Sequence, residues 1–424
     1  MLQINHIIEN QESVVKGLAR RGLTDAEPMV EKLLQTDRER RQTQTELDGV
    51  LAESNRISKQ IGQLMQQGKT EEAEAVKRQT GELKEQSKGL GEQLRMLEED
   101  LQQQLYQLPN VPHPSVPDGR TSDDNEVIYE YGQRPELPDD ALPHWELIEK
   151  YGIIDFEVGS KITGAGFPVY KGKGARLQRA LINFFLDEAV AAGYTEVQPP
   201  MLVNEASGYG TGQLPDKEGQ MYELKEEALY LIPTAEVPIT NMYRDTILKS
   251  SDLPVMNVGY TSCFRREAGS WGADVRGLNR LHQFDKVEIV QIRRPEQSYT
   301  ALEEMALHVR QLLEKLDLPH RVLKLCAGDM GFTSALTYDM EVYSAAQQRW
   351  LEVSSVSIFE TYQANRLKLR YRDEDGKTQL LHTLNGSALA LPRIVAALLE
   401  NNQEANGVRI PEVLVPYTGF DRIQ

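Results

Sequence analysis

The sequence has little cysteine and no long apolar run, and each absence excludes a class of protein. Only Cys263 and Cys326 occur among 424 residues, too few for a disulfide framework and without the paired spacing of a zinc site. No apolar run approaches the roughly 20 residues of a membrane span, and no charged-then-apolar leader opens the chain. We therefore expect a cytoplasmic protein with no zinc and no membrane partner.

An excess of positive charge is also missing. The formal net charge is -17 and the pI is near 5.0, which argues against a protein that coats nucleic acid without specificity, so any RNA contact must be local. The phosphate-binding pattern GxxxxGK followed by Ser or Thr is absent, and with it the sign of the parallel nucleotide fold. A chain of 424 residues, 40% hydrophobic, is long enough for two domains.

Residues 28–108 are rich in Gln, Glu, Lys, Arg and Leu and predict two long helices with one turn, at residues 67–70. In the second half a seam recurs at spacings of three and four: Ala73, Val76, Thr80, Leu83, Ser87, Leu90, Leu94, Leu97 and Leu101. The first half repeats this rhythm at Leu47, Val50, Ser54, Ile57, Ile61 and Leu64. The pattern predicts an antiparallel two-stranded coiled coil, on the order of 60 Å long.

The purpose of this hairpin stays open on the pattern alone. A heptad seam is as typical of a dimerisation or spacer coiled coil as of a binding arm, and its basic side chains are interspersed with acids. From residue 109 to about 143 the chain is dense in Pro, Asp and Gly, which cannot continue a helix. We interpret this as a linker between a domain of residues 1–110, with the arm at about 28–108, and a domain of residues 111–424.

The segment from Thr261 to Glu288 carries the densest chemistry: TSCFRREAG, a loop with Gly and Arg, then LHQFDKVE. Two β-compatible runs, Gly259–Phe264 and Phe284–Ile292, flank the loop and predict an antiparallel pair of strands. A period of two then puts Arg265 and Glu267 on one strand face. An arginine there can fork onto a phosphate or a carboxylate.

Other pieces accompany this segment. On the second strand, Phe284 and Glu288 share a face, so cation, stacking surface and anion lie on one sheet. Residues 174–200 predict a long amphipathic helix, a break at Gly193 and a short strand ended by two prolines. Residues 231–236, LIPTAE, put a hydroxyl and a carboxylate in a loop, where helix capping is an equal explanation.

Two C-terminal pieces complete the set: residues 351–355, LEVSS, and residues 383–393, TLNGSALALPR, a strand that runs into a helix. In chain order, GYTEVQPP, FRREAG through HQFDKVE, and NGSALALPR resemble the three motifs of bacterial-type seryl-tRNA synthetases, which are class II aminoacyl-tRNA synthetases. The resemblance covers essentially the whole chain. It implies an α+β fold, with an antiparallel sheet flanked by helices and preceded by the coiled-coil hairpin.

The resemblance also implies an ATP site. Arg265 would bridge the α-phosphate and the amino-acid carboxylate, and Glu267 would bind the adenine amino group. Phe284 would stack on one face of adenine, while Arg393 would cover the other face and neutralise the outer phosphates. The whole ATP-binding set is Arg265, Arg266, Glu267, Phe284, Glu352, Val353, Ser354, Ser355 and Arg393. Glu352 and Ser355 correspond to the family's ligands for Mg²⁺, which prefers such hard oxygen donors.

For serine, the resemblance implies Thr234 and Glu288 at the ammonium group, and Glu288 with Ser387 at the side-chain hydroxyl. The whole serine-binding set is Thr234, Ala235, Glu236, Arg265, Glu288, Asn385 and Ser387. Alanine would leave these polar groups unpaired, and a site of that kind can reject it by about 10⁴ to 10⁵. Cys263 and His282 lie nearby, and we expect them to pack rather than react.

The implied reaction is that of a seryl-tRNA synthetase: ATP and Mg²⁺ activate L-serine to seryl-adenylate, which is transferred to the 3′ end of tRNA(Ser). Charging of tRNA(Sec) stays open. The hairpin would grip the long variable arm of the tRNA by shape. A homodimer is implied, with the helix that begins near Gly174 at its interface, and the loop Ala268–Arg280 is expected to move as the tRNA arrives.

Three alternatives remain beside this interpretation. An enzyme on the same scaffold could load another small amino acid onto a tRNA or a carrier protein, although a carrier-protein enzyme has no use for the arm. A binding protein could have kept the arm and lost the chemistry, against which the intact Arg265, Glu267, Glu352 and Arg393 count. A pure coiled-coil scaffold would leave most of the chain unexplained.

Overall fold

The structure is a computed structural model that describes residues 1–138, 140–267 and 276–424. Its contacts divide the chain into two compact units. The N-terminal unit comprises Leu2–Ala19 and Leu23–Pro109, and the second unit comprises Met1, Arg20–Gly22 and Asn110–Gln424. Each unit has its own architecture, and the chemistry predicted from the motifs falls in the second.

The helices of the N-terminal unit are α1 (Ile4–Glu9), α2 (Gln11–Arg20), α3 (Ala26–Gln66) and α4 (Thr70–Gln107). In the second unit the helices are α5 (His144–Lys150), α6 (Phe156–Ile162), α7 (Gly172–Ala191), α8 (Glu205–Thr211), α9 (Glu236–Asn241), α10 (Ser298–Lys315), α11 (Thr361–Leu367), α12 (Leu391–Asn401) and α13 (Val415–Thr418). The predicted hairpin is confirmed, since α3 and α4 pack along each other and the chain reverses at residues 67–69.

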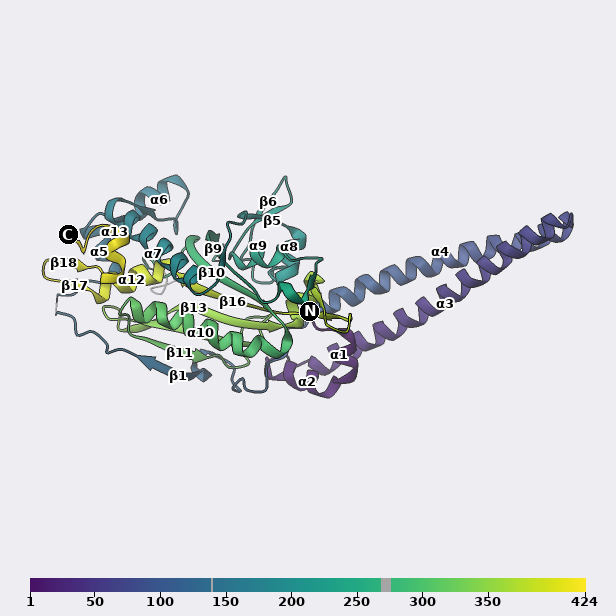
Figure 1. Cartoon of the computed structure of the whole chain (residues 1–424), viewed down its shortest axis with the longest axis horizontal. Helices are drawn as coiled ribbons and strands as arrows, with labels where there is room; N and C mark the ends of the chain where they lie inside the picture. The colour runs from purple at the N-terminus through teal and green to yellow at the C-terminus, as the bar shows by residue number, and fades with distance from the viewer. Residues whose placement is uncertain (139, 268–275) are drawn as a thin grey trace. The chain divides into compact units, whose positions relative to one another are not determined.

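The seam of the hairpin lies where the heptads predict it. Every predicted seam residue in α3 and α4 is buried or half-buried, and Ile57, Ala73, Leu94 and Leu101 are the most enclosed. Gly68 takes a left-handed φ of 72° at the turn, which suits glycine because it has no Cβ to clash. At 1.5 Å per residue, the 41 residues of α3 extend about 60 Å. The unit therefore presents a long two-helix arm (Figure 1).

The second unit is built on one large sheet. Its strands follow the order β1-β11-β12-β13-β16-β10-β9-β4, and each neighbouring pair is antiparallel except β4 with β9. The bounds of these strands are β1 (Glu126–Tyr131), β4 (Thr195–Glu196), β9 (Val255–Phe264), β10 (Gln283–Arg293), β11 (His320–Lys324), β12 (Leu336–Ser344), β13 (Arg349–Glu360) and β16 (His382–Ala390). The predicted antiparallel sheet is confirmed.

Short strands form small sheets around this one. Their bounds are β2 (Ile154–Asp155), β3 (Val169–Tyr170), β5 (Leu202–Asn204), β6 (Tyr222–Leu224), β7 (Leu229–Leu231), β8 (Ile247–Lys249), β14 (Arg370–Arg372), β15 (Thr378–Leu380), β17 (Gln403–Glu404), β18 (Gly407–Arg409) and β19 (Arg422–Ile423). Helices α7, α10 and α12 pack on the large sheet and contribute apolar side chains to a continuous core with it (Figure 1). Burial of this apolar surface is the main force that holds the sheet rigid.

Two local expectations differ from the structure. The segment expected to be a linker contains β1, which pairs with β11 at the end of the sheet. Its six residues do not alternate, since only Tyr129 is half-buried, so no period of two marks this strand in the sequence. Arg265 and Glu267 do not share a strand face, since β9 ends at Phe264 and Glu267 has a φ of 50°. In the part of the chain that the structure describes, no helix is both long and apolar enough to cross a membrane.

Candidate active site

Most of the predicted site residues come from four strands that are neighbours in the large sheet, and from the turns at their ends, whereas Thr234, Ala235 and Glu236 come from the turn between β7 and the start of α9. β9 and β10 pair from Val255 with Ile292 to Phe264 with Gln283, so the two halves of the segment with the densest chemistry meet as predicted. β16 pairs with β10 on one side and with β13 on the other, and it runs directly into α12. Figure 1 shows this strip of β9, β10, β16 and β13 at the centre of the sheet.

Glu288 is the centre of a buried polar cluster. Its Oε1 accepts a hydrogen bond from Asn385 Nδ2 at 3.1 Å, and its Oε2 accepts one from Ser387 Oγ at 3.4 Å. Register explains this, because Glu288 on β10 lies directly opposite Ser387 on β16. Lys286 Nζ lies 2.6 Å from Glu288 Oε2 and donates to Thr234 Oγ1 at 2.7 Å. Four predicted residues, Glu288, Asn385, Ser387 and Thr234, therefore lie in one cluster. Lys286 links Thr234 to Glu288, and the sequence analysis did not predict it.

Lys286 could have been found from the sequence. It lies two residues before Glu288 on the same strand, so a period of two puts both side chains on one face. Both side chains are buried, with 6% and 1% of their surface exposed. A buried carboxylate needs a partner of opposite charge, and the ammonium of Lys286 provides it where the family resemblance expects the ammonium of serine.

Glu236 is a second buried carboxylate beside this cluster. It begins α9, and its backbone N–H donates to Thr234 Oγ1 at 3.2 Å, so Thr234 also serves the helix start. Its Oε1 accepts a bond from Gln363 Nε2 at 2.6 Å. Burial, together with the nearby negative charge of Glu288, raises the pKa of Glu236 to about 7, although the bond from Gln363 and the charges of Lys286 and Arg265 oppose the shift. No sequence pattern pointed to Gln363.

Arg265 lies at the end of β9 above an aromatic ring. Its guanidinium carbon is 5.3 Å from the centre of the Phe284 ring, and its Nε donates to the carbonyl of Pro233 at 3.3 Å. An arginine stacked in this way keeps most of its five N–H groups available in a fixed plane. The carbonyl of Pro233, next to Thr234, and the ring of Phe284 therefore hold the guanidinium of Arg265.

Glu267 follows on the same turn. Its backbone N–H donates to Gln220 Oε1 at 3.1 Å, while the backbone N–H of Arg266 donates to the Gln220 carbonyl at 2.9 Å. Arg280 donates from Nε to Glu267 Oε2, so one carboxylate oxygen is paired. The side chain of Arg266 is exposed. The turn is thus held by Gln220, another residue that the motifs did not indicate.

Arg393 and Glu352 form the third part of the site. Arg393 Nη1 donates to the carbonyl of Glu352 at 2.6 Å and lies 3.7 Å from its Oε2, and Arg393 Nε donates to the carbonyl of Asn279 at 3.0 Å. Ser355 Oγ donates to Glu352 Oε1 at 3.5 Å. The side chain of Glu352 is 51% exposed and available to a ligand. Val353 and Ser354, between them, are buried, and Ser354 Oγ donates to the carbonyl of Ser387 at 2.6 Å.

The groups expected to hold Mg²⁺ fit a hard cation. Glu352 and Ser355 offer oxygen atoms near each other, and Asp339 lies opposite Ser355 on the next strand. Asp339 Oδ1 is buried without a hydrogen-bond partner, and burial with the charge of Glu352 raises the pKa of Asp339 well above its usual value. Within the described ranges no three His, Cys, Asp or Glu side chains gather to hold a metal, so substrate oxygens would have to complete the coordination of any ion here.

Cys263 and His282 lie close to the site and are occupied by packing. Cys263 is fully buried and burial raises the pKa of its thiol, which makes the reactive thiolate less available. His282 stacks on Phe167 with ring centres 5.4 Å apart, and its Nδ1 is 2.8 Å from the hydroxyl of Tyr222. Both contacts agree with the predicted structural role.

The loop expected to move, Ala268–Arg280, is described only in part, since residues 268–275 lie outside the described residues. Its end is well connected. Leu278 and Asn279 are buried, the Leu278 N–H donates to His144 Nε2 at 2.9 Å, and the Asn279 carbonyl accepts from Arg393 as noted above. Arg276–Asn279 is therefore attached to the rest of the unit.

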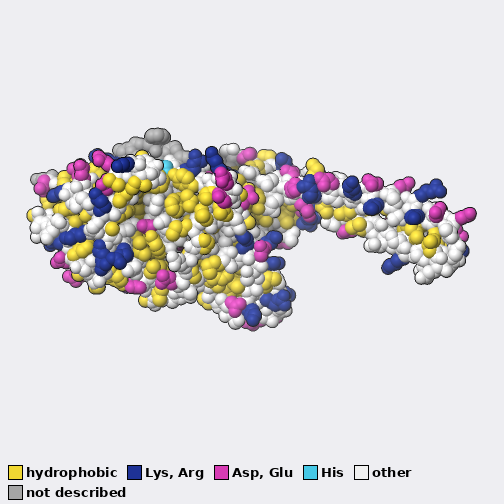
Figure 2. Space-filling model, turned by 90° about the horizontal axis from the view of Figure 1, so that it is seen from above, with side chains coloured by type: hydrophobic (Ala, Val, Ile, Leu, Met, Phe, Trp, Pro, Cys, Tyr) yellow, Lys and Arg dark blue, Asp and Glu magenta, His cyan; other side chains and the backbone are white. Residues whose placement is uncertain are grey.

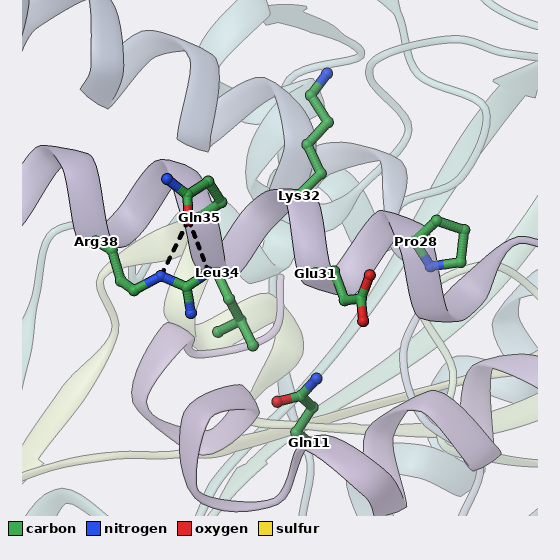
Figure 3. Close-up of a pocket in the computed structure, with 7 residues that line it drawn as sticks. All are labelled: Gln11, Pro28, Glu31, Lys32, Leu34, Gln35 and Arg38. Atoms are coloured by element: carbon green, nitrogen blue, oxygen red, sulfur yellow. Dashed lines mark hydrogen bonds between the residues drawn. The ribbon is translucent and has the colours of Figure 1, made fainter.

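A separate hollow lies in the N-terminal unit. It has a volume of about 470 Å³ between α2 and the start of α3, and Figure 3 shows the lining residues Gln11, Pro28, Glu31, Lys32, Leu34, Gln35 and Arg38. Arg38 turns back along the helix to Gln35, with Nη2 to Oε1 at 2.8 Å. The hollow shares no residue with the predicted active site.

Comparison with known proteins agrees with this geometry. Residues 1–112 match the seryl-tRNA synthetase N-terminal domain, and residues 221–402 match the tRNA synthetase class II core domain (G, H, P, S and T). The serine--tRNA ligase of Salinibacter ruber is 53% identical over 100% of this chain and 99% of its own, and that of Chlorobaculum parvum is 47% identical over the full length of both.

Solved structures show the same relationship. The seryl-tRNA synthetase of Pyrococcus horikoshii complexed with ATP has a TM-score of 0.92 at 35% identity, and it is covered to 99% by 100% of this chain. The cytoplasmic serine-tRNA ligase of Naegleria fowleri in complex with AMP has a TM-score of 0.87 at 26% identity, with the same coverage. The antiparallel sheet and its cluster of Arg, Phe and Glu define a class II aminoacyl-tRNA synthetase core. The chain belongs to the seryl-tRNA synthetase family.

Proposed function

We propose that the protein is an ATP-dependent serine--tRNA ligase whose chemistry takes place at the Glu288, Arg265 and Arg393 cluster. The observation that supports this most is the meeting of Glu288, Asn385, Ser387 and Thr234 in one buried polar cluster, in a chain that belongs to the seryl-tRNA synthetases over its whole length. Such a cluster suits an amino acid that carries an ammonium group and a hydroxyl.

In the first step, the carboxylate of serine attacks the α-phosphorus of ATP and releases pyrophosphate. The carboxylate is ionised at pH 7, so no general base is required, and catalysis consists of positioning and charge stabilisation. Arg265 forks between the α-phosphate and the carboxylate, and Phe284 beneath it offers a face to adenine. Glu267 receives the adenine amino group through the carboxylate oxygen that Arg280 leaves free.

When serine binds, Thr234 and Glu288 each exchange Lys286 for serine as their binding partner. The ammonium of serine takes Thr234 and Glu288 from Lys286, which contacts both residues in the structure. The hydroxyl of serine lies between Glu288 and Ser387, beside Asn385. Alanine would leave these groups unpaired in a dry site, and threonine would be excluded by the limited space.

Glu352 and Ser355 would hold Mg²⁺, with Asp339 behind them as a further carboxylate. An ion held there would supply positive charge to the triphosphate of ATP. Arg393, on the carbonyl of Glu352, neutralises the outer phosphates from the other side. Arg393 acts there through both its positive charge and its planar guanidinium, so lysine would not replace it.

In the second step, the 3′-terminal ribose hydroxyl of tRNA(Ser) attacks the adenylate. The arm of α3 and α4 grips the long variable arm of the tRNA by its shape and backbone, since the deep groove of helical RNA is closed to side chains. Figure 2 shows Lys and Arg side chains interspersed with Asp and Glu along the visible face of the arm, so the contact is local. The working form is a homodimer, and the charging of tRNA(Sec) is a further possibility to test.

The decisive experiment is the exchange of labelled pyrophosphate into ATP, measured with a panel of amino acids in the presence of Mg²⁺. Exchange with serine at least 10⁴ times more efficient than with alanine is expected. Exchange supported by glycine or alanine instead would show a different enzyme on the same scaffold. A chain that supports no exchange with any amino acid would be a binding protein. Charging assays with tRNA(Ser) and tRNA(Sec) transcripts, run in parallel, show whether the protein also charges tRNA(Sec).

A further inference from the structure

His144 and Glu400 form a buried pair that the proposed reaction does not use. His144 Nδ1 lies 2.7 Å from Glu400 Oε1, and neither side chain has any exposed surface. The backbone N–H of His144 donates to the same oxygen at 2.9 Å, and Ser344 Oγ donates to the other oxygen. Burial would raise the pKa of Glu400, but the hydrogen bonds from His144 and Ser344 outweigh it and lower the pKa. The carboxylate is therefore ionised and only accepts.

This pairing fixes the tautomer of the imidazole. Because a carboxylate has no proton to offer, Nδ1 of His144 carries the proton, and Nε2 of a neutral ring is then an acceptor. Nε2 faces a donor, the backbone N–H of Leu278, at 2.9 Å. Glu400 thus holds His144 in the one neutral form that can bind the end of the loop between β9 and β10.

The same helix end holds the two residues before Leu278. Gly277 has a φ of 66°, and a Cβ at this position would overlap His144 Nε2, so only glycine allows the ring so close. The guanidinium of Arg276 lies 4.8 Å from the centre of the Trp145 ring, a distance typical of a cation–π contact. His144 and Trp145, the first two residues of α5, therefore clamp three consecutive residues of the loop.

The clamp continues directly to the active site. The next residue, Asn279, accepts the bond from Arg393 Nε on its carbonyl at 3.0 Å. Its side chain donates to Gln347 Oε1 at 3.0 Å, and Gln347 Nε2 donates to Glu400 Oε1 at 3.0 Å. Arg393 and Glu400 lie seven residues apart on α12, two helical turns, so the network begins and ends on one helix.

We propose that His144 is a positioning residue for ATP binding: its Nε2 fixes the main chain at Leu278, and the neighbouring Asn279 carbonyl then fixes the guanidinium of Arg393. The inference rests on the proposed role of Arg393 at the phosphates of ATP. It makes Arg276–Asn279 a fixed part of the loop.

Two substitutions of His144 distinguish the role of Nε2 from that of Nδ1. In His144→Gln the side-chain oxygen can take the place of Nε2 and accept from Leu278, whereas in His144→Asn the amide takes the place of Nδ1 and cannot reach the loop. Both remove the buried ring, so loss of packing should lower the melting temperature of both. A purely structural histidine would give equal defects in both variants.

The first measurement is the KM for ATP and for serine in pyrophosphate exchange. His144→Asn should raise the KM for ATP about tenfold, the effect of losing one hydrogen bond of roughly 1.4 kcal/mol, with the KM for serine changed less than twofold. His144→Gln should stay within about threefold of the unaltered protein. Equal changes in the two variants, or an unchanged KM for ATP in His144→Asn, would overturn the proposal.

A second pair of variants keeps the test open if His144→Asn does not fold. Gly277→Ala pushes the imidazole away from Leu278 without removing it, and Gly376→Ala introduces the same left-handed strain, at a φ of 79°, in open space. Only Gly277→Ala should raise the KM for ATP. Amide hydrogen exchange at Leu278 should accelerate at least tenfold in this variant, and an unchanged rate would contradict the anchor.

Arg393→Ala separates this inference from the function on which it rests. If this variant leaves the KM for ATP unchanged while serine-dependent exchange persists, the proposed role of Arg393 is wrong and so is the link to His144. If Arg393→Ala raises the KM for ATP and the His144 variants do not, only the positioning role is wrong.

Discussion

At the scale of single residues, the active site is a balance of buried charges. Glu236 and Glu288 are both buried carboxylates, and Lys286 and Arg265 provide two cations near them. A buried charge is tolerated only when it is paired or hydrogen-bonded. The zwitterion of serine adds no net charge, so its binding leaves the net charge of this cluster unchanged.

Arg265→Lys should slow serine-dependent exchange about 10²-fold or more, because an ammonium cannot fork onto phosphate and carboxylate together. The rate of pyrophosphate exchange at saturating serine and ATP measures the effect. Arg372→Lys, at an exposed position on β14, is the matched control and should leave the rate unchanged. A near-normal rate in Arg265→Lys would remove the bridging role.

Lys286→Met should lower the free energy of unfolding by about 3–5 kcal/mol, because Glu288 would be left as a buried charge without its partner at 2.6 Å. Urea denaturation without substrate measures this. In the control Lys324→Met, an ammonium 3.9 Å from the exposed Glu126 is removed, and the loss should stay below about 1 kcal/mol. Similar losses in the two variants would show that Lys286 does not neutralise Glu288.

Glu236 should give the stability of the protein a pH dependence. Its pKa is raised to about 7 in the folded state, so between about pH 4.5 and 7 the folded state binds more protons than the unfolded state, and stability falls as the pH rises. Glu236→Gln removes this dependence while its oxygen still accepts from Gln363. Relative to the unaltered protein, the variant should gain roughly 3 kcal/mol between pH 5 and pH 8. A constant difference across this range would place the pKa of Glu236 near its ordinary value.

At the scale of elements, the strands and the arm follow different rules. Register between β10 and β16 brings Glu288 opposite Ser387, and a slip of one residue would turn each side chain to the other face of the sheet. The arm contains no strand register that places functional side chains opposite one another. Its seam fixes only how α3 and α4 pack, so its outer face is free to serve the tRNA.

Shortening the arm should separate the two steps of the reaction. Replacing residues 45–91 by a short turn removes a segment symmetrical about the reversal at residues 67–69. Serine-dependent pyrophosphate exchange should stay within about twofold. Charging of tRNA(Ser) should fall on the order of 10²-fold or more, since about 3 kcal/mol of tRNA binding would be lost. An equal loss in both assays would indicate that the arm supports folding instead.

At the scale of the whole molecule, one end of the large sheet is an open edge. On β1, Val127 and Ile128 are 43% and 42% exposed, and an apolar edge strand invites pairing or coverage by another chain. We expect a second copy of the chain to cover it in the homodimer, in addition to the interface that the family resemblance implies at α7. Sedimentation equilibrium should give twice the chain mass of 48.0 kDa, and Ile128→Asp should reduce it. A monomer that exchanges pyrophosphate at the full rate would refute the dimer requirement.

The fold was largely predictable because its signals are local. Spacings of three and four gave the arm, and alternation with glycine and proline breaks gave β9, β10 and α7 within a few residues. The prediction failed at β1, where no alternation marks the strand, and at Glu267, which has a left-handed φ just after the end of β9. Both failures depend on contacts with distant parts of the chain.

The sequence by itself determined the arm and the pairing of β9 with β10 through local periodicity, and it determined the family and the candidate site residues through motifs that resemble those of the seryl-tRNA synthetases. Tertiary structure alone decided which distant side chains form ion pairs and hydrogen bonds with one another. It joined Lys286 to Thr234, gave Glu236 its partner Gln363, and connected Arg393 through the loop to His144 and Glu400. These partners lie tens to hundreds of residues apart, and only the pairing of strands and the packing of α5, α11 and α12 bring them together.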